Sequence, residues 1–263
     1  MNQPAGRALV TGAARRLGRA MALYLALRGH DVAVHYATSA NEAAAVVAEI
    51  RAMGRMAVAL QADLLVEHEM QALVGRAADA LGGALTLLVN NASVFEYDTL
   101  STATAESWHR HIGSNLRAPF VLTQAFAAQA PLGGVDAAGE RLARALVVNM
   151  VDQRVLKPTP EFMTYALAKA ALWALTRTAA QALAPDIRVN AIGPGPTMQG
   201  ARQSVQHFAR QRVATILQRG AGAGDITAAL GYLIDAPGVT GQLLLVDGGQ
   251  HLAWQTPDIL GLD

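Results

Sequence analysis

The sequence predicts an α/β protein built on a doubly wound parallel sheet, and two observations predict it. Short β-branched and leucine-rich runs alternate with longer alanine-rich stretches of helical period along the chain, which is the pattern of repeated strand–helix units. The first run leads through a turn with Gly12 and Gly18 into a helical stretch. In such a fold ligands bind beyond the carboxyl ends of the strands, so informative residues should follow the strand runs.

Seven strands and seven helices are expected, with at least one helix between every two consecutive strands. The strands are residues 8–11, 31–36, 56–60, 85–90, 145–150, 187–192 and 242–246. The helices are residues 17–28, 40–53, 67–81, 114–130, 161–183, 201–217 and 225–233. Right-handed crossovers between these elements give a Rossmann fold with helices on both faces of a seven-stranded sheet.

Length and composition favour a single domain over residues 1–263. The chain is 52% hydrophobic, which suffices for one large core, and no linker, low-complexity tract or repeat divides it. Its formal charge is +1 with scattered arginines, which argues against nucleic-acid binding and against a polybasic membrane anchor. No signal-peptide pattern and no apolar run of ~18 residues are present, so we expect a soluble protein.

The chain has no cysteine, which excludes disulfides, cysteine-based zinc sites, iron–sulfur clusters and a thiol nucleophile. This composition fits a reducing cytoplasm. His109, His111, His207 and His251 have no metal-ligand spacing, so we expect no metal site and interpret them as surface or lid residues.

The turn after the first strand predicts a pyrophosphate site. Gly12 permits a tight turn, and Gly18 lets the helix lie close to the sheet. The free N–H groups at the start of the helix would face the phosphates, beside Arg15, Arg16 and Leu17. Residues 1–100 are therefore expected to form the nucleotide-binding half and residues 101–263 the catalytic half.

The second strand ends in His35 and Tyr36, and no carboxylate follows to bind the ribose 2′-hydroxyl of NAD. Arg15 brings positive charge and Ser39 a hydroxyl, so the sequence favours a 2′-phosphate and therefore NADP(H). The alternative is that Arg15 is a solvated loop residue.

Lys157 and Lys169 are the only lysines among 21 lysine and arginine residues, and Lys169 lies one helical turn after Tyr165. Residues four apart share a helix face, and a nearby ammonium lowers a phenol pKa that starts near ~10. The pair is suited to acid–base chemistry. Taken alone, an accidental pair on a solvated helix face explains the spacing equally well.

Polar and glycine residues follow the later strands as well. They are Asp63 and Leu64 after the third strand, Asn91, Ala92 and Ser93 after the fourth, Asn115 near the next helix start, Asp152 after the fifth, and Pro194, Gly195 and Thr197 after the sixth. Asp63 is placed to accept from an adenine amino group or, equally, to cap the following helix. The rigid Gly-Pro run borders a nicotinamide in this interpretation, and residues 196–217, with Gly200 as a hinge, form a substrate lid.

With these residues in order, nearly the whole chain resembles the short-chain dehydrogenase/reductase family. The resemblance implies that Tyr165 is the proton donor, that Lys169 binds the nicotinamide ribose and lowers the tyrosine pKa, and that Asn115 holds a water in a proton relay. Thr197 would bind the carboxamide, and subunits would pair through the helices at 114–130 and 161–183 into a homotetramer. The chain departs from the family pattern at Asp152, normally serine, and at Arg16, normally glycine.

Both departures occur in the pteridine reductase and dihydromonapterin or dihydrobiopterin reductase branch. This resemblance implies that Phe95 and the nicotinamide sandwich a flat pterin, that Arg16 reaches over the cofactor phosphate toward it, and that Ser93 touches cofactor or ligand. A carboxyl group at 152 suits a ring rich in N–H groups and ring nitrogens. The expected activity is NADPH-dependent reduction of a 7,8-dihydropterin to a tetrahydropterin, with oxidised pterins as further candidate substrates. One mismatch is Thr38, where that branch has a basic residue.

Two other functions stay open. A short-chain carbonyl or 3-oxoacyl thioester reductase is the alternative enzyme, although Asp152 polarises a carbonyl less well than a hydroxyl does. A non-catalytic NADP(H)-binding regulator is the alternative outside enzymes. Two of the proposed site residues also have a purely structural interpretation: Phe95 as a core residue and Asp152 as a loop cap.

Overall fold

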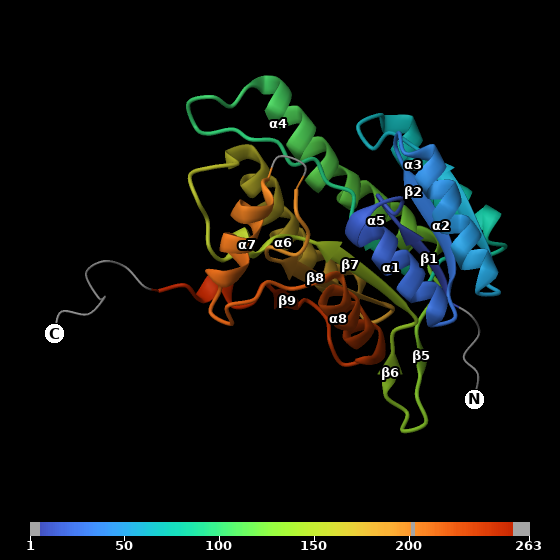
Figure 1. Cartoon of the computed structure of the whole chain (residues 1–263). Coiled ribbons are helices and arrows are strands. Elements are labelled where there is room, and N and C mark those ends of the chain that lie inside the picture. Colours follow the sequence, from blue (N-terminus) through green and yellow to red (C-terminus); the bar gives the residue numbers. More distant parts are fainter. Residues whose placement is uncertain (1–5, 201–202, 255–263) are drawn as a thin grey trace.

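The computed structural model describes residues 6–200 and 203–254 and contains the expected seven-stranded parallel sheet (Figure 1). Its strands are β1 (Arg7–Val10), β2 (Asp31–Tyr36), β3 (Ala57–Gln61), β4 (Leu87–Asn90), β7 (Ala145–Met150), β8 (Ile187–Pro194) and β9 (Leu243–Val246). Their order is β3-β2-β1-β4-β7-β8-β9, and every neighbouring pair is parallel. The predicted fold class is confirmed.

Helices cover both faces of this sheet. They are α1 (Arg16–Leu27), α2 (Ala40–Ala52), α3 (Glu67–Ala80), α4 (Ala105–Ile112), α5 (Ala118–Gln129), α6 (Met163–Leu183), α7 (Val205–Val213) and α8 (Ala223–Asp235). Buried side chains of α1, α2 and α8 pack with one face of the sheet, and those of α3, α5 and α6 pack with the other. The strands are buried from both sides, which explains their near-continuous apolar sequences.

The predicted helix 114–130 was wrong at its start. The helical segment begins with α4, where Thr104 and Ser107 form a reciprocal capping box, and passes through a π-helical turn at Gly113–Arg117 into α5. Most residues of α4 are polar, so its sequence shows no clear apolar period. Asn115 therefore lies in a π-helical turn inside a longer helical segment and does not open a helix.

Smaller differences concern the other boundaries. The helix predicted at 161–183 begins at Met163, and that predicted at 201–217 is α7 over Val205–Val213, with residues 201–202 outside the described part. A hairpin of β5 (Gly134–Val135) and β6 (Arg141–Leu142) was not predicted and extends from the body of the molecule (Figure 1). Its two-residue strands are too short for a periodic signal.

The strand order places the carboxyl ends of β1 and β4 side by side, at the point where the order in which strands are added reverses. From β1 the chain adds β2 and β3 on one side, and from β4 it adds the later strands on the other. Ligands of doubly wound sheets bind at this switch point. The predicted site residues after β1, β4, β7 and β8 share this edge because all strands run parallel.

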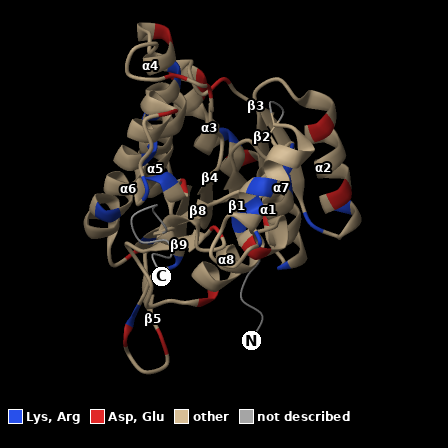
Figure 2. Cartoon of the chain, turned by 60° about the vertical axis from the view of Figure 1, so that its left-hand side comes forward, with Lys and Arg blue, Asp and Glu red and all other residues tan. Residues whose placement is uncertain are grey.

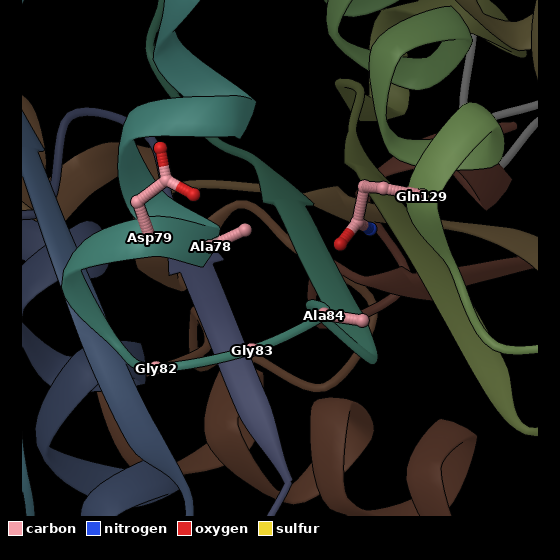
Figure 3. Close-up of a pocket in the computed structure, with 6 residues that line it drawn as sticks. All are labelled: Ala78, Asp79, Gly82, Gly83, Ala84 and Gln129. Carbon is pink, nitrogen blue, oxygen red and sulfur yellow. The ribbon is translucent and has the colours of Figure 1, made fainter.

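A surface hollow lies elsewhere, between the end of α3 and the start of β4 (Figure 3). It is lined by Ala78, Asp79, Gly82, Gly83, Ala84 and Gln129. The side-chain amide of Gln129 already forms two hydrogen bonds with the backbone of Leu85: its oxygen accepts from the Leu85 N–H, and its nitrogen donates to the Leu85 carbonyl oxygen. The hollow is at the amino end of β4, away from the residues predicted to carry chemistry.

Over the described residues, no helix combines the length and apolar character needed to cross a bilayer. In Figure 2 the basic and acidic positions are interspersed along the ribbon, without a continuous stripe of one sign.

Candidate active site

The loop between β1 and α1 has the features of an anion cradle. Gly12 adopts φ 61°, which favours glycine, and a Cβ atom on Gly18 would lie 2.1 Å from the carbonyl oxygen of Gly12. No side chain caps the first turn of α1, so its N–H groups are available to a ligand. Leu17 packs against the core and anchors this turn. The loop fits the pyrophosphate of a dinucleotide.

His35 was predicted to bind cofactor, but the structure places it beneath the loop. It is 2% exposed; Gly12 N donates to its Nδ1 at 3.0 Å, and Nε2 lies 3.0 Å from the carbonyl oxygen of Ala62. The first contact makes Nδ1 an acceptor, so Nε2 carries the proton and donates to Ala62. His35 supports the loop from behind, and burial lowers its pKa to about 4.

The two loop arginines point in different directions. Arg15 forms an ion pair with Glu42 of α2, so part of its charge is already paired. Arg16, at φ 54°, donates to the carbonyl oxygens of Met198 (3.0 Å) and Gln199 (2.7 Å) and so joins the loop to the predicted lid. Ser39 precedes α2 without using its hydroxyl as a cap.

The predicted cofactor residues at the ends of β2 and β3 differ in exposure. Asp63 is exposed and accepts from Leu65 N at 2.9 Å, whereas the N-cap of α3 is Val66, so the helix-cap alternative for Asp63 is wrong. Leu64 is buried, and Tyr36, at the end of β2, packs partly into the core.

Thr11 connects the turn after β4 to the phosphate loop. The Nδ2 of Asn91 donates to the carbonyl oxygens of Thr11 and Gly12, and Ala92 N donates to Thr11 Oγ1 at 2.9 Å. Ser93, next in the chain, is exposed at the edge of the site.

Tyr165 and Lys169 are buried in the first turns of α6, so the solvated-face alternative is wrong. They are 6% and 2% exposed. The Tyr165 hydroxyl donates to Asp152 Oδ2 at 2.9 Å, while Asp152 Oδ1 accepts from Arg154 N at 2.9 Å. Lys169 Nζ donates to the carbonyl oxygen of Met150 at 2.7 Å and lies 5.7 Å from the Tyr165 ring centre.

The electrostatics reverse one expectation. Burial raises the pKa of Tyr165 well above its ordinary value, and the adjacent Asp152 raises it further, so the predicted lowering of this pKa was wrong. Burial also raises the pKa of Asp152 and lowers the pKa of Lys169 to about 8. Tyr165 is therefore a protonated donor at neutral pH, and the three groups titrate as a coupled set.

Phe95 is 45% exposed, so it is not a core residue. Its ring stacks on Phe162 with centres 4.3 Å apart and planes within 6°, and meets Tyr165 edge-on at 4.7 Å. An aromatic surface therefore lies directly beside the hydroxyl that donates to Asp152.

Asn115 and the segment after β8 also lie at the carboxyl edge of the sheet. Asn115 is fully buried; its Oδ1 accepts from Val94 N and its Nδ2 donates to the Val94 carbonyl oxygen, so it fixes the loop that leads to Phe95. Pro194 ends β8, Gly195 packs on Asp247, and Thr197 Oγ1 donates to the carbonyl oxygen of Gly195 at 3.0 Å.

Comparison with known proteins agrees with this arrangement. Residues 7–209 match the family model described as short chain dehydrogenase. The chain belongs to the short-chain dehydrogenase family. The expectation of an oxidoreductase of this family is confirmed at that level.

Among proteins of known structure, the chain is similar to FolM Alternative dihydrofolate reductase 1 from Brucella suis, solved in complex with NADP. The two share 42% identity with a TM-score of 0.89, over 97% of this chain and 98% of the other. A short chain dehydrogenase from Burkholderia cenocepacia, also in complex with NADP, is 34% identical with a TM-score of 0.83, covering 94% and 98%. The 3-oxoacyl-[acyl-carrier-protein] reductase FabG of Staphylococcus aureus is 32% identical, covering 93% of this chain and 98% of FabG.

Sequence reasoning missed two residues of this short-chain dehydrogenase site, Arg154 and Phe162. The Arg154 guanidinium carbon lies 4.8 Å from the Phe162 ring centre and 5.8 Å from that of Phe95. Its charge favours the ionised forms of both Asp152 and Tyr165 and so lowers their pKa values against burial. The position two residues after Asp152 was the available signal for Arg154; Phe162 had none, because its stacking is a tertiary contact.

His111 was also misinterpreted. The sequence indicated a surface or lid residue, but the ring is fully buried between the loop after β4 and the start of α6, with both nitrogens in hydrogen bonds. Exposed His109, two positions earlier, fits the prediction. Because α4 is short, its sequence pattern did not indicate which histidine faces inward.

Proposed function

We propose that this short-chain dehydrogenase is an NADPH-dependent reductase of a dihydropterin. The observation that carries the proposal is the 2.9 Å hydrogen bond from Tyr165 to Asp152 beside the ring of Phe95. A carboxyl group at this point can exchange a proton with a ring nitrogen, and a flat aromatic side chain suits a planar heterocycle. The likeness to FolM, a dihydrofolate reductase by name, supports the same substrate class.

The bound cofactor would supply a hydride to the carbon of a ring C=N bond. Tyr165 and Asp152 then supply the proton that the adjacent nitrogen gains, so that a tetrahydropterin and NADP⁺ result. The raised pKa values of both groups keep a transferable proton in the pair at neutral pH. The Lys169 ammonium, 5.7 Å from the Tyr165 ring centre, stabilises the negative charge that remains when the proton leaves the pair.

Several groups support NADP(H) as the cofactor. The glycine loop and the uncapped start of α1 suit the pyrophosphate, and residues 37–41, directly after β2, include no carboxylate. The Ser39 hydroxyl, unused as a helix cap, and the start of α2 suit a 2′-phosphate. Arg15 contributes less than its charge suggests because it is paired with Glu42. In this proposal the described residues 196–200 and 203–217 belong to the lid, to which Arg16 connects the loop.

The second candidate is a 3-oxoacyl thioester reductase, which the 32% identity to FabG over 93% of the chain favours. Asp152 speaks against it, because its carboxyl group already accepts from the Tyr165 hydroxyl and polarises a carbonyl less well than a hydroxyl residue does.

Loss of NADPH absorbance with a panel of substrates tests the proposal. Dihydrobiopterin, dihydromonapterin, dihydrofolate, an acetoacetyl thioester and a simple ketone should be compared, each with NADPH and with NADH. We expect turnover of a dihydropterin with NADPH. Preferential thioester turnover would establish the second candidate, tighter binding of NADH would remove the NADP assignment, and NADPH binding without any turnover would indicate a regulator.

A further inference from the structure

A buried polar cluster lies beside the aromatic surface, and the proposed reaction does not use it. It consists of Asp98 from the loop after β4, His111 of α4 and Thr164 of α6, each at most 3% exposed. We refer to these residues as the Asp98–Thr164–His111 network. Three segments distant in sequence meet in it, so each of its hydrogen bonds fixes one segment relative to another.

The hydrogen bonds determine which atom donates and which accepts at each contact of the network. Glu96 N donates to His111 Nε2 at 3.1 Å, so the ring proton is on Nδ1, which donates to Thr164 Oγ1 at 2.7 Å. The Thr164 hydroxyl in turn donates to Asp98 Oδ2, and Asp98 Oδ1 accepts from Thr164 N at 3.1 Å. This chain of bonds requires a neutral His111 in the Nδ1–H tautomer.

The network is attached directly to the residues of the candidate active site. Tyr165 follows Thr164, and its ring meets that of His111 edge-on at 6.1 Å. Phe162 N donates to the carbonyl oxygen of Asp98 at 2.8 Å. Phe162 adopts φ 56°, a strained conformation for an aromatic residue that persists only where its surroundings hold it, and in this position it stacks on Phe95.

We propose that the Asp98–Thr164–His111 network is a positioning device that holds the Phe95–Phe162 stack and Tyr165 in place for substrate, and that protonation of His111 releases them. Its residues position other groups and do not touch the reacting atoms. Only the identity of the substrate rests on the proposed pterin reduction.

The release follows from geometry. A second proton on His111 must sit on Nε2, where it faces the N–H of Glu96, so that hydrogen bond breaks. The charged and titratable groups around the ring are Asp98 and Glu96 from the loop, Arg110 of α4, and Tyr165 of α6. Burial lowers the pKa of His111 below its ordinary value, and Arg110 lowers it further, while Asp98 and Glu96 act in the opposite direction. His111 is therefore protonated, and the stack and Tyr165 are released, only at acidic pH.

Two pairs of variants test the network. Thr164→Val removes the hydroxyl at nearly constant shape, and Thr164→Ser retains it. His111→Gln keeps an acceptor for Glu96 N without a titrating proton, and His109→Gln alters the exposed histidine of the same helix as a control. KM and kcat are measured between about pH 8 and pH 5 with whichever substrate the parent reduces best, together with NADPH affinity and melting temperature.

For the parent and for His109→Gln we expect KM to rise as pH falls toward 5. His111→Gln should lack this acid rise in KM, and Thr164→Val should have, at every pH, a KM about tenfold above the value of the parent at pH 8, with unchanged NADPH affinity. Thr164→Ser should resemble the parent. An acid rise in KM that persists in His111→Gln, or a Thr164→Val protein with lowered melting temperature and unaltered KM and kcat, would overturn the proposal.

An activity-independent measurement accompanies the kinetics. Nitrogen NMR of histidine-labelled protein should show His111 as the neutral Nδ1–H tautomer at neutral pH. Separately, we expect the rings of Phe95 and Phe162 to move apart as His111 takes up a proton. The opposite tautomer would refute the network. If dihydropterins are not reduced but another substrate shows the expected pattern, the proposed function fails and the positioning device remains.

Discussion

The hydroxyl of Tyr165 donates to Oδ2 of Asp152 across 2.9 Å, and both side chains have pKa values raised by burial. A short-chain dehydrogenase with a hydroxyl residue at position 152 would present two neutral donors to its substrate. This chain instead presents a phenol and a carboxyl group that share protons, which is the basis for the first prediction.

Asp152→Asn should abolish most pterin reduction while leaving NADPH affinity unchanged. The amide keeps the size of the carboxyl but has no transferable proton, and loss of a general acid typically costs ~10²–10⁴-fold in rate. Asp152→Ser should lose pterin turnover and retain or improve reduction of ketones. Steady-state rates across pH check both; parent-like pterin turnover in both variants would reduce Asp152 to a loop cap.

Phe95→Ala should raise the KM for a dihydropterin roughly threefold to tenfold, because the substrate loses one stacking partner. The melting temperature should fall little, since Phe95 is 45% exposed and truncation of a core phenylalanine would cost ~3–5 kcal/mol. Tyr232→Ala, at a residue 53% exposed on α8, is the control and should leave KM unchanged. A large loss of stability with unchanged KM would contradict a stacking role.

Arg154→Met should extend pterin reduction to higher pH. The charge of Arg154 lowers the pKa values of Asp152 and Tyr165, so its removal raises both, and the pair keeps its proton further into the alkaline range. Arg154→Lys, which retains a positive charge, serves as the control. Removing the guanidinium from the face of Phe162 should cost only about 0.5–1 kcal/mol of stability. Identical pH–rate profiles for the parent and Arg154→Met would exclude the electrostatic role.

His35 should make the protein sensitive to acid. Its pKa falls from an ordinary 6.5 to about 4 in the folded chain, so its stabilising contribution is complete above pH 6.5 and is lost as pH falls through about 4. The loss amounts to about 3 kcal/mol. Asparagine at this position can accept from Gly12 N without titrating.

Denaturant unfolding at a series of pH values measures the effect. His35→Asn should flatten the fall in stability relative to the parent, while His68→Gln, at an exposed histidine of α3, should leave it unchanged. Equal slopes for the parent and His35→Asn would show that His35 is not the responsible group.

We also predict a homotetramer. Trp108 of α4, Phe120 of α5 and Leu167 of α6 are 44–46% exposed, and α5 and α6 pack on the same face of the sheet. Apolar side chains exposed in this way favour burial against another subunit. Light scattering at micromolar concentration should give four times the mass of one chain, and Leu167→Glu should yield smaller species. A monomeric parent would refute the prediction.

Part of this protein could be predicted from the sequence because the signals are local. Strand runs followed by helical periods determine the order of the strand–helix units, and Gly12 and Gly18 mark the phosphate loop through backbone requirements that no other residue meets. The four-residue spacing of Tyr165 and Lys169 places both on one face of a helix wherever that helix packs.

What the tertiary structure decided depends on contacts between distant segments. Whether Lys169 or Asp152 dominates the Tyr165 pKa depends on burial and on which oxygen the hydroxyl faces, and neither has a sequence period. The same holds for the stack of Phe162 on Phe95 and for the inward orientation of His111. Spacing along the chain selects the residues that can react, whereas packing sets the dielectric and the partners that determine how they do so.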